Sequence, residues 1–177
     1  MGFDKLVAPF AGEPLARRVA RALAELRPLV VATPAIAAVL ADEAGVDVVV
    51  TEPTAGPSET LRIADAATER DRSLAVLPCD LPFIDAARVR AFVARVPDAA
   101  DVAWPIVRDV PGHPVLWSPR ARSRIARLAP DAAPMRVRDD PALRALAIVC
   151  DDVAYVTDVD TPDAWAAAEA RATSARR

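Results

Sequence analysis

Short β-branched runs alternate with amphipathic stretches along this chain, and this alternation constrains the fold more than any other feature. The β-branched runs lie at 28–33, 46–52, 73–80, 101–107, 114–118 and 153–160. The Ala-, Arg- and Leu-rich stretches lie at 14–27, 34–44, 58–70, 85–96, 119–129, 140–147 and 162–172. Runs such as Val48–Val50 are apolar at consecutive positions, which is typical of parallel strands buried on both faces. The pattern predicts an α/β fold, a layered sheet with right-handed crossovers.

Composition bounds the class of protein. The 177 residues fit one domain spanning 1–177, and 53% hydrophobic with 27% charged residues is typical of a globular chain. The net charge of −3 gives no basic excess, so we expect no nucleic-acid partner. No apolar run has transmembrane length and no signal peptide opens the chain, so we expect no membrane partner and a cytoplasmic location. Cys79 and Cys150 lack metal-binding spacing; reduced thiols are expected, and a disulfide between them stays open.

Asp80 is the strongest candidate for chemistry. Ligands of α/β sheets bind at the carboxyl ends of strands, and Asp80 follows the buried run in "SLAVLPCD". A carboxylate there suits magnesium, which prefers oxygen ligands. The structural alternative is a helix cap, but Asp85 is better placed for that role, directly before "AARVRAF".

A second acidic segment, "TDVDTPDAW", follows the last β-branched run. Thr161 and Pro162 form a helix start, as N-cap and first helical residue. Asp158 and Asp160 precede them and, on a strand, would share a face, where two carboxylates repel unless they share a cation. One of them is expected to complete a metal site with Asp80; ordinary solvated turn aspartates are the equal alternative.

Three further segments carry weaker signals. Gly112 permits close backbone approach to a ligand, and His113, the only histidine, offers a donor and an acceptor. Ser58 precedes a helical stretch, where it serves either as an N-cap or beside an anion. Lys5 follows Gly2 just before the first helical stretch, which suggests a phosphate-binding turn, although a surface lysine is the simpler interpretation.

Taken in order, these segments resemble the molybdenum-cofactor nucleotidyltransferases, the MobA-like NTP transferases, and in particular their cytidylyltransferase-like branch. "MGFDKL" resembles the end of an AGxSxRMG…DKL signature, "GPSETLRIADA" a GxSxSLRxG segment, and "LPCDLPFID" a GDxPFV metal motif. "GHPVLW" resembles GHPVLF, "DVDTPDAW" matches DVDTPEDL, and "DDPALRAL" resembles GDxGARAL more weakly. The order and spacing of these motifs are specific, whereas no single motif is decisive.

The resemblance implies a Rossmann-like three-layer nucleotidyltransferase fold with a mostly parallel sheet. It implies magnesium-dependent transfer of CMP from a nucleoside triphosphate, CTP or GTP being the candidates, to molybdopterin with release of pyrophosphate. A molybdoenzyme is a further implied partner. The implied site residues are Lys5 and Asp80 as catalytic groups, Asp80 and Asp160 (less so Asp158) as metal ligands, Ser58 and Gly2 by the nucleotide, and Gly112 and His113 by the pterin.

One departure from the family pattern bears on activity. The family's opening strand, expected in the middle of the sheet, and the AGxS part of its loop have no counterpart here, and only Met1 and Gly2 remain of the loop. Three explanations stay open: a start assigned too late, which we favour, a rearrangement of the remaining strands, or a strand supplied by a partner chain. Two other functions also stay open: guanylyl transfer to another phosphorylated small molecule, and a non-catalytic accessory role in molybdoenzyme maturation.

Overall fold

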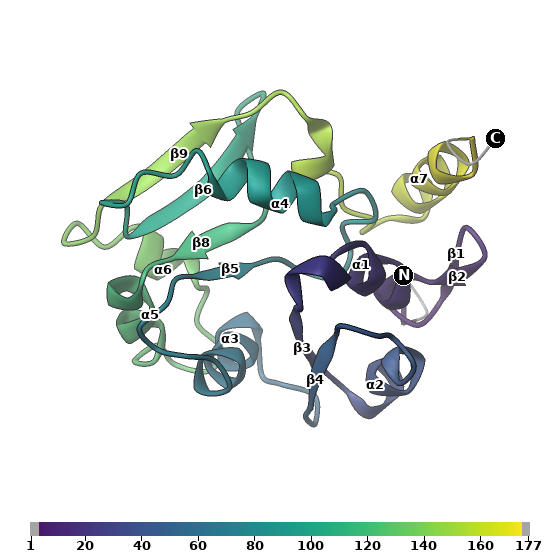
Figure 1. Ribbon diagram of the computed structural model, residues 1–177, viewed down its shortest axis with the longest axis horizontal. Coiled ribbons are helices and arrows are strands. Elements are labelled where there is room, and N and C mark those ends of the chain that lie inside the picture. The colour runs from purple at the N-terminus through teal and green to yellow at the C-terminus, as the bar shows by residue number, and fades with distance from the viewer. Residues whose placement is uncertain (1–3, 175–177) are drawn as a thin grey trace.

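Strands and helices alternate along the computed structural model, which describes residues 4–174 (Figure 1). The strands are β1 Pro9–Phe10, β2 Glu13–Pro14, β3 Leu29–Ala32, β4 Asp47–Val50, β5 Leu74–Val76, β6 Val102–Val107, β7 Val110–Pro111, β8 Val115–Trp117 and β9 Ala145–Val149. The α-helices are α1 Leu15–Ala22, α2 Pro34–Leu40, α3 Pro57–Ala66, α4 Ala86–Val93, α5 Pro119–Ile125, α6 Met135–Arg138 and α7 Pro162–Ser174. Short 3₁₀ helices lie at η1 Ala24–Leu26 and η2 Val153–Tyr155.

The strands form separate sheets. β3 pairs with β4, while β5, β8 and β6 follow one another in a second sheet that β7 and β9 extend from β6. Within residues 4–174 no strand pairs with both β3 and β5, so these two sheets stay unjoined. The remaining strands therefore do not rearrange into one continuous sheet, which removes that explanation for the expected gap.

Strand pairing is mixed, where the sequence predicted a mostly parallel sheet. The pairs β3–β4 and β6–β9 are parallel, and β5–β8 and β6–β8 are antiparallel. The connection from β6 to β8 spans only 108–114 and includes β7, which leaves no room for the crossover helix that a parallel pair requires.

Two predicted elements are wrong. The stretch 140–147 was expected as a helix, but Ala145–Val149 forms β9, because parallel pairing of all five of its residues with β6 overrides its Ala/Leu-rich helical composition. The run 153–160 was expected as a strand, but Asp152 accepts a hydrogen bond from the Ala154 amide and starts the turn η2 instead. Asp158 and Asp160 therefore do not lie on a strand.

The core occupies both faces of the five-stranded sheet. Ala103 and Val107 of β6 pack with α1 and α4, whereas Val102, which points to the opposite face, packs with α3, α5 and α6. Helices therefore cover the sheet on both sides. The structure confirms the expected three-layer α/β arrangement, although the pairing within its sheets is mixed.

The last helix, α7, lies beside the β1–β2 hairpin, close to the N-terminal part of the chain (Figure 1). The rings of Phe10 and Trp165 meet edge to face, with centroids 5.2 Å apart, and Thr161 caps the helix by accepting a hydrogen bond from the Ala164 amide, as predicted. This contact holds the 156–161 segment next to the turn that precedes α1. No helix within residues 4–174 is long and apolar enough to cross a membrane.

Candidate active site

A short turn fixes the backbone around Lys5. The Ala8 amide donates to the Asp4 carbonyl, and the Leu6 amide donates to the Asp4 carboxylate. The first amides of α1 donate back to this turn, from Ala16 to the Leu6 carbonyl over 2.9 Å. These bonds satisfy amides that the start of a helix leaves unpaired. They place Lys5 beside the helix start.

Asp80 lies in the turn that follows β5. Leu81 and Ile84 are buried and anchor this turn in the core. Asp85 caps α4 by accepting from the Arg88 amide at 2.8 Å, as predicted, so Asp80 has no capping role. Its Oδ2 accepts a hydrogen bond from Lys5 Nζ at 2.7 Å, while its Oδ1 is buried with no partner among the described residues.

Asp160 also contacts Lys5, through its Oδ1. Val159 is fully buried, which holds the segment against the core and leaves the aspartates on either side of it exposed. No hydrogen bond or ion pair between Lys5 and Asp158 is present in the described part of the chain. The structure therefore brings Lys5, Asp80 and Asp160 together from three distant parts of the sequence.

The charges of this cluster influence one another. Burial by itself lowers the pKa of Lys5, but its hydrogen bonds to Asp160 and Asp80 raise it above the ordinary value. Burial, together with the negative charges of Asp160 and Asp80, raises the pKa of Asp158.

Burial of the Cys79 thiol, with Asp80 beside it, raises its pKa to about 11. The thiol is protonated at neutral pH and supplies no nucleophile. Both cysteines are free.

His113 lies on the rim of the same cluster. Burial lowers the pKa of its imidazole, although the Val76 backbone and the carboxylates of Asp80 and Asp158 act in the opposite direction. The ring is thus neutral at pH 7, and its buried Nδ1 has no hydrogen-bond partner within residues 4–174.

Gly112 has a structural reason to be glycine. A Cβ there would lie 2.3 Å from the Tyr155 carbonyl oxygen, which also accepts a hydrogen bond from the His113 amide. The close approach that glycine permits is therefore to η2 of the same chain. Sequence analysis missed Tyr155 as the residue that positions His113, since 153–160 read as a strand; Asp152, a turn-forming residue just upstream, was the available signal.

Ser58 is not brought into this cluster. It was considered as an N-cap, but Gly56 is the N-cap of α3 and Pro57 its first residue. The Ser58 side chain is fully buried, and its hydroxyl donates to the Ala132 carbonyl at 2.6 Å. A nucleotide contact by Ser58 stays a prediction. Gly2, the other residue expected at the nucleotide, lies outside the described residues.

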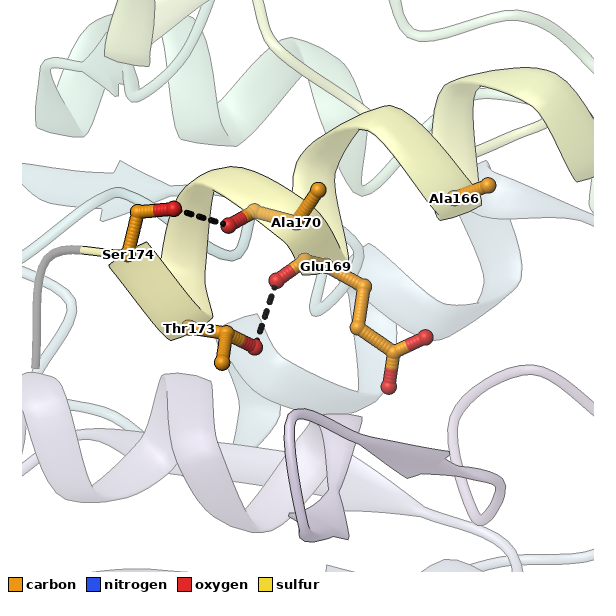
Figure 2. Close-up of a pocket in the computed structure, with 5 residues that line it drawn as sticks. All are labelled: Ala166, Glu169, Ala170, Thr173 and Ser174. Carbon is orange, nitrogen blue, oxygen red and sulfur yellow. Dashed lines mark hydrogen bonds between the residues drawn. The ribbon is translucent and has the colours of Figure 1, made fainter.

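A hollow of the surface lies elsewhere, on one side of α7 (Figure 2). It measures about 560 Å³ and is lined by Ala166, Glu169, Ala170, Thr173 and Ser174. The hydroxyls of Thr173 and Ser174 donate to carbonyls of the preceding turn of the same helix, as the dashed lines in Figure 2 show. Because Glu169 is the one ionisable side chain among the lining residues, chemistry is better sought around Lys5.

The carboxylates of the cluster fit a hard divalent cation. Asp80 Oδ1 is a buried acceptor without a donor, which a cation would satisfy. No group of three or more His, Cys, Asp or Glu side chains within residues 4–174 forms a cage for a metal. Magnesium commonly needs none, because it binds through one or two carboxylates, waters and substrate phosphates.

Comparison with known proteins decides the family. Residues 1–146 match the MobA-like NTP transferase domain. The chain belongs to this family. The expected membership among MobA-like NTP transferases is thereby confirmed, and with it the general class of nucleotidyltransferase. No curated protein matches the chain.

Solved structures share the fold of this MobA-like domain. The Rv0371c homolog from Mycobacterium sp. strain JC1 is 23% identical with a TM-score of 0.80, over 99% of this chain and 91% of that chain. Rv0371c from Mycobacterium tuberculosis H37Rv, in a complex with manganese, is 25% identical with a TM-score of 0.72, over 94% of this chain and 91% of that one. Molybdopterin-guanine dinucleotide biosynthesis protein A from Archaeoglobus fulgidus is 15% identical with a TM-score of 0.75, over 98% and 92%.

Proposed function

We propose that this chain transfers CMP from CTP to a phosphate group of a molybdopterin-type cofactor. An oxygen of the acceptor phosphate attacks the α-phosphorus, the bond from that phosphorus to the bridging oxygen breaks, and pyrophosphate leaves. Such transfer depends on positioning and charge neutralisation, and needs no nucleophile from the protein. The family, the manganese complex of one structural neighbour and the molybdopterin-related name of another support metal-dependent nucleotidyl transfer to such an acceptor, whereas the choice of CTP rests on the resemblance of the motifs to the cytidylyltransferase-like branch.

The observation that carries the proposal is the arrangement of Asp80. Its carboxylate is 17% exposed, one oxygen contacts Lys5, and the other is buried without a donor. A structural aspartate in this position would have both oxygens satisfied. Asp80 and Asp160 would hold magnesium, which when bound neutralises charge on the triphosphate.

The other residues of the cluster have roles that follow from their charge and burial. Lys5 would neutralise negative charge on the phosphates, since its ammonium is positively charged and partly exposed. His113, neutral at pH 7, would offer its unpaired Nδ1 to a donor group of the pterin. Both residues stand within the electrostatic reach of Asp80, so triphosphate and acceptor would meet at this cluster.

The test is pyrophosphate release with CTP, GTP or ATP in the presence of magnesium and molybdopterin. We expect release with CTP, and an Asp80→Asn variant should be slower by a factor of about 10² or more, the scale for losing one electrostatic catalytic group. Asp85→Asn is the matched control: it makes the same chemical change five residues away, and asparagine still caps α4, so its rate should equal that of the wild type.

Other outcomes separate the competing functions. Release with GTP and a different phosphorylated acceptor, but not with molybdopterin, would support the guanylyltransferase alternative. An Asp80→Asn variant that retains the full rate would contradict a metal-binding role for Asp80. Binding of molybdopterin without turnover of any nucleotide would favour the non-catalytic accessory role.

A further inference from the structure

Lys5 already occupies the carboxylates assigned to the metal. Its Nζ lies 2.7 Å from Asp80 Oδ2 and also contacts Asp160 Oδ1. These are the two residues that would hold a divalent cation in the proposed function. Two cations cannot use the same oxygens without strong repulsion, so the ammonium and the metal exclude each other from this position.

The ammonium satisfies the cluster incompletely. Lys5 brings one positive charge to two carboxylates, those of Asp80 and Asp160. Lys5 contacts only one oxygen of Asp80 and leaves Oδ1 without a donor. A divalent cation would bring more charge and could satisfy the remaining oxygen, so the cluster suits a cation of higher charge than Lys5 provides.

Lys5 can leave without unfolding its turn. The backbone around it is held by the bonds between the turn and α1, which do not involve the side chain. The Asp160 side chain is 62% exposed, so the contact with Asp160 opens directly to solvent. A flexible four-carbon stem carries the ammonium, so rotation about its bonds suffices to move it from the carboxylates.

We propose that Lys5 is an internal counter-ion that a divalent cation displaces from Asp80 and Asp160, which frees its ammonium for the nucleotide phosphates. This inference rests on the metal site of the proposed function. In the metal-free protein, Lys5 would keep the carboxylates of Asp80 and Asp160 close to each other. It also couples metal to nucleotide, because phosphates compensate the displaced charge and thereby favour the metal-bound arrangement.

Because Lys5 is the only lysine of the chain, its amine can be followed directly. We expect saturating magnesium to increase the acetylation rate of Lys5 at least about fivefold, because only the neutral amine is acetylated and an ion pair of about 1 kcal/mol disfavours that form by about this factor. The rate is measured by peptide mass spectrometry on the wild-type chain, with free Nα-acetyl-lysine in the same tube as the reference. A rate that magnesium leaves unchanged or reduces would overturn the displacement.

Manganese affinity provides a second readout that is independent of turnover. Electron paramagnetic resonance of free manganese should show about fivefold tighter binding to Lys5→Met than to the wild type, because the internal competitor is gone. Lys5→Arg should bind as weakly as the wild type. Arg72→Met removes a positive charge from an exposed pair elsewhere and should change nothing.

The variants separate this inference from the proposed function. If Asp80→Asn abolishes manganese binding while Lys5→Met binds no tighter than the wild type, the metal site stands and the displacement is wrong. If Asp80→Asn binds manganese as the wild type does, the metal site itself is wrong, and this inference fails with it. Tighter binding by Lys5→Met together with loss in Asp80→Asn supports both.

Discussion

Two cations of this chain each bridge two aspartates: Arg88 in the first turn of α4, and Lys5 in the turn before α1. Arg88 contacts Asp85 and, over 2.7 Å, Asp152. Lys5 contacts Asp80 and Asp160. Both arrangements join residues distant in sequence, and both cations have a raised pKa. From charge alone they look alike.

The difference lies in the second oxygens of the carboxylates. Asp85 Oδ1 accepts from the Arg88 amide, and Asp152 Oδ1 accepts from the Ala154 amide, so the four oxygens around Arg88 each have a donor. Asp80 Oδ1, in contrast, has none among the described residues, although it is buried. The Arg88 cluster is complete and caps two helical turns. The Lys5 cluster retains an unmet acceptor, which is typical of a site that binds a ligand.

The buried ion pair between Arg122 and Asp65 should show the largest effect on the free energy of unfolding. Arg122 is 3% exposed, bonds to Asp65 at 2.6 Å, and also donates to two backbone carbonyls beyond the end of α3. Arg122→Ala leaves Asp65 charged and unpaired in the interior, so the free energy of unfolding should fall by about 3–5 kcal/mol. Denaturant unfolding of both proteins measures it.

Arg72→Ala is the control for this substitution. Its guanidinium pairs with Glu69 at 3.4 Å, and both side chains are more than two-thirds exposed, at 75% and 71%. Removing it should change the free energy of unfolding by less than about 0.5 kcal/mol. If Arg122→Ala lowers the free energy of unfolding by less than about 1 kcal/mol, the number of hydrogen bonds around a cation does not distinguish structural from functional cations in this protein.

The backbone at Gly112, beside the Lys5 cluster, should be more sensitive to substitution than the ion pairs of that cluster. In Gly112→Ala, the new Cβ would lie 2.3 Å from the Tyr155 carbonyl oxygen, so η2 must move and the free energy of unfolding should fall by about 1–3 kcal/mol. The matched control is Gly56→Ala, where the nearest atom would be 3.4 Å away. Equal losses in the two variants, measured by urea unfolding, would contradict the close-packing argument.

The sequence predicted the parts of this molecule that local chemistry determines. The helix starts at Asp85 and Thr161 followed from capping residues, and five of the β-branched runs formed strands within their expected ranges. It failed where tertiary contacts decide. β9 pairs with β6 despite its helical composition, and η2 forms where Asp152 bonds to the backbone of a β-branched run.

The site shows the same division. The order of motifs along the chain brought Lys5, Asp80 and Asp160 into one hypothesis, and the structure places them in contact. Motif order placed Ser58 by the nucleotide but could not reveal that its hydroxyl donates to the Ala132 carbonyl, 74 residues away. Nor could it reveal that Lys5 lies between the two carboxylates, since that depends on how the turn docks on α1 and on the segment before α7.

Magnesium should distinguish the two bridging cations. Without metal, Lys5→Met and Arg88→Met should each lower the free energy of unfolding by about 1 kcal/mol, because their partners are partly exposed. Added magnesium should restore stability to Lys5→Met by binding the vacated carboxylates, and leave Arg88→Met destabilised. Thermal unfolding with and without added magnesium measures this. Equal rescue of both variants would mean that the two clusters do not differ in ligand binding.

The smallest expected change in the free energy of unfolding concerns Asp152, one of the two aspartates of the Arg88 cluster. The Ala154 amide and then the Arg88 guanidinium lower the pKa of its carboxyl below the ordinary 3.8. A lowered folded-state pKa contributes stability that is present above pH 3.8 and is lost as the pH falls through the folded-state pKa. Asp152→Asn keeps the acceptor for Ala154 but removes the charge, so at pH 7 it should cost about 0.5 kcal/mol, a value reduced by the 39% exposure of the side chain.

As the pH falls below 3.8 and through the lowered folded-state pKa of Asp152, the difference between Asp152→Asn and the wild type should shrink toward zero, because the carboxyl then becomes protonated in the folded state too. Urea unfolding from pH 7 down to pH 3 measures the difference, with Asp151→Asn as the control: its neighbouring carboxylate is exposed and makes no hydrogen bond or ion pair within residues 4–174. A constant difference across this range would show that Arg88 and Asp152 are held together by shape rather than by charge. The Arg88 cluster would then owe its stability to helix capping, and only the Lys5 cluster would depend on the charge of its cation.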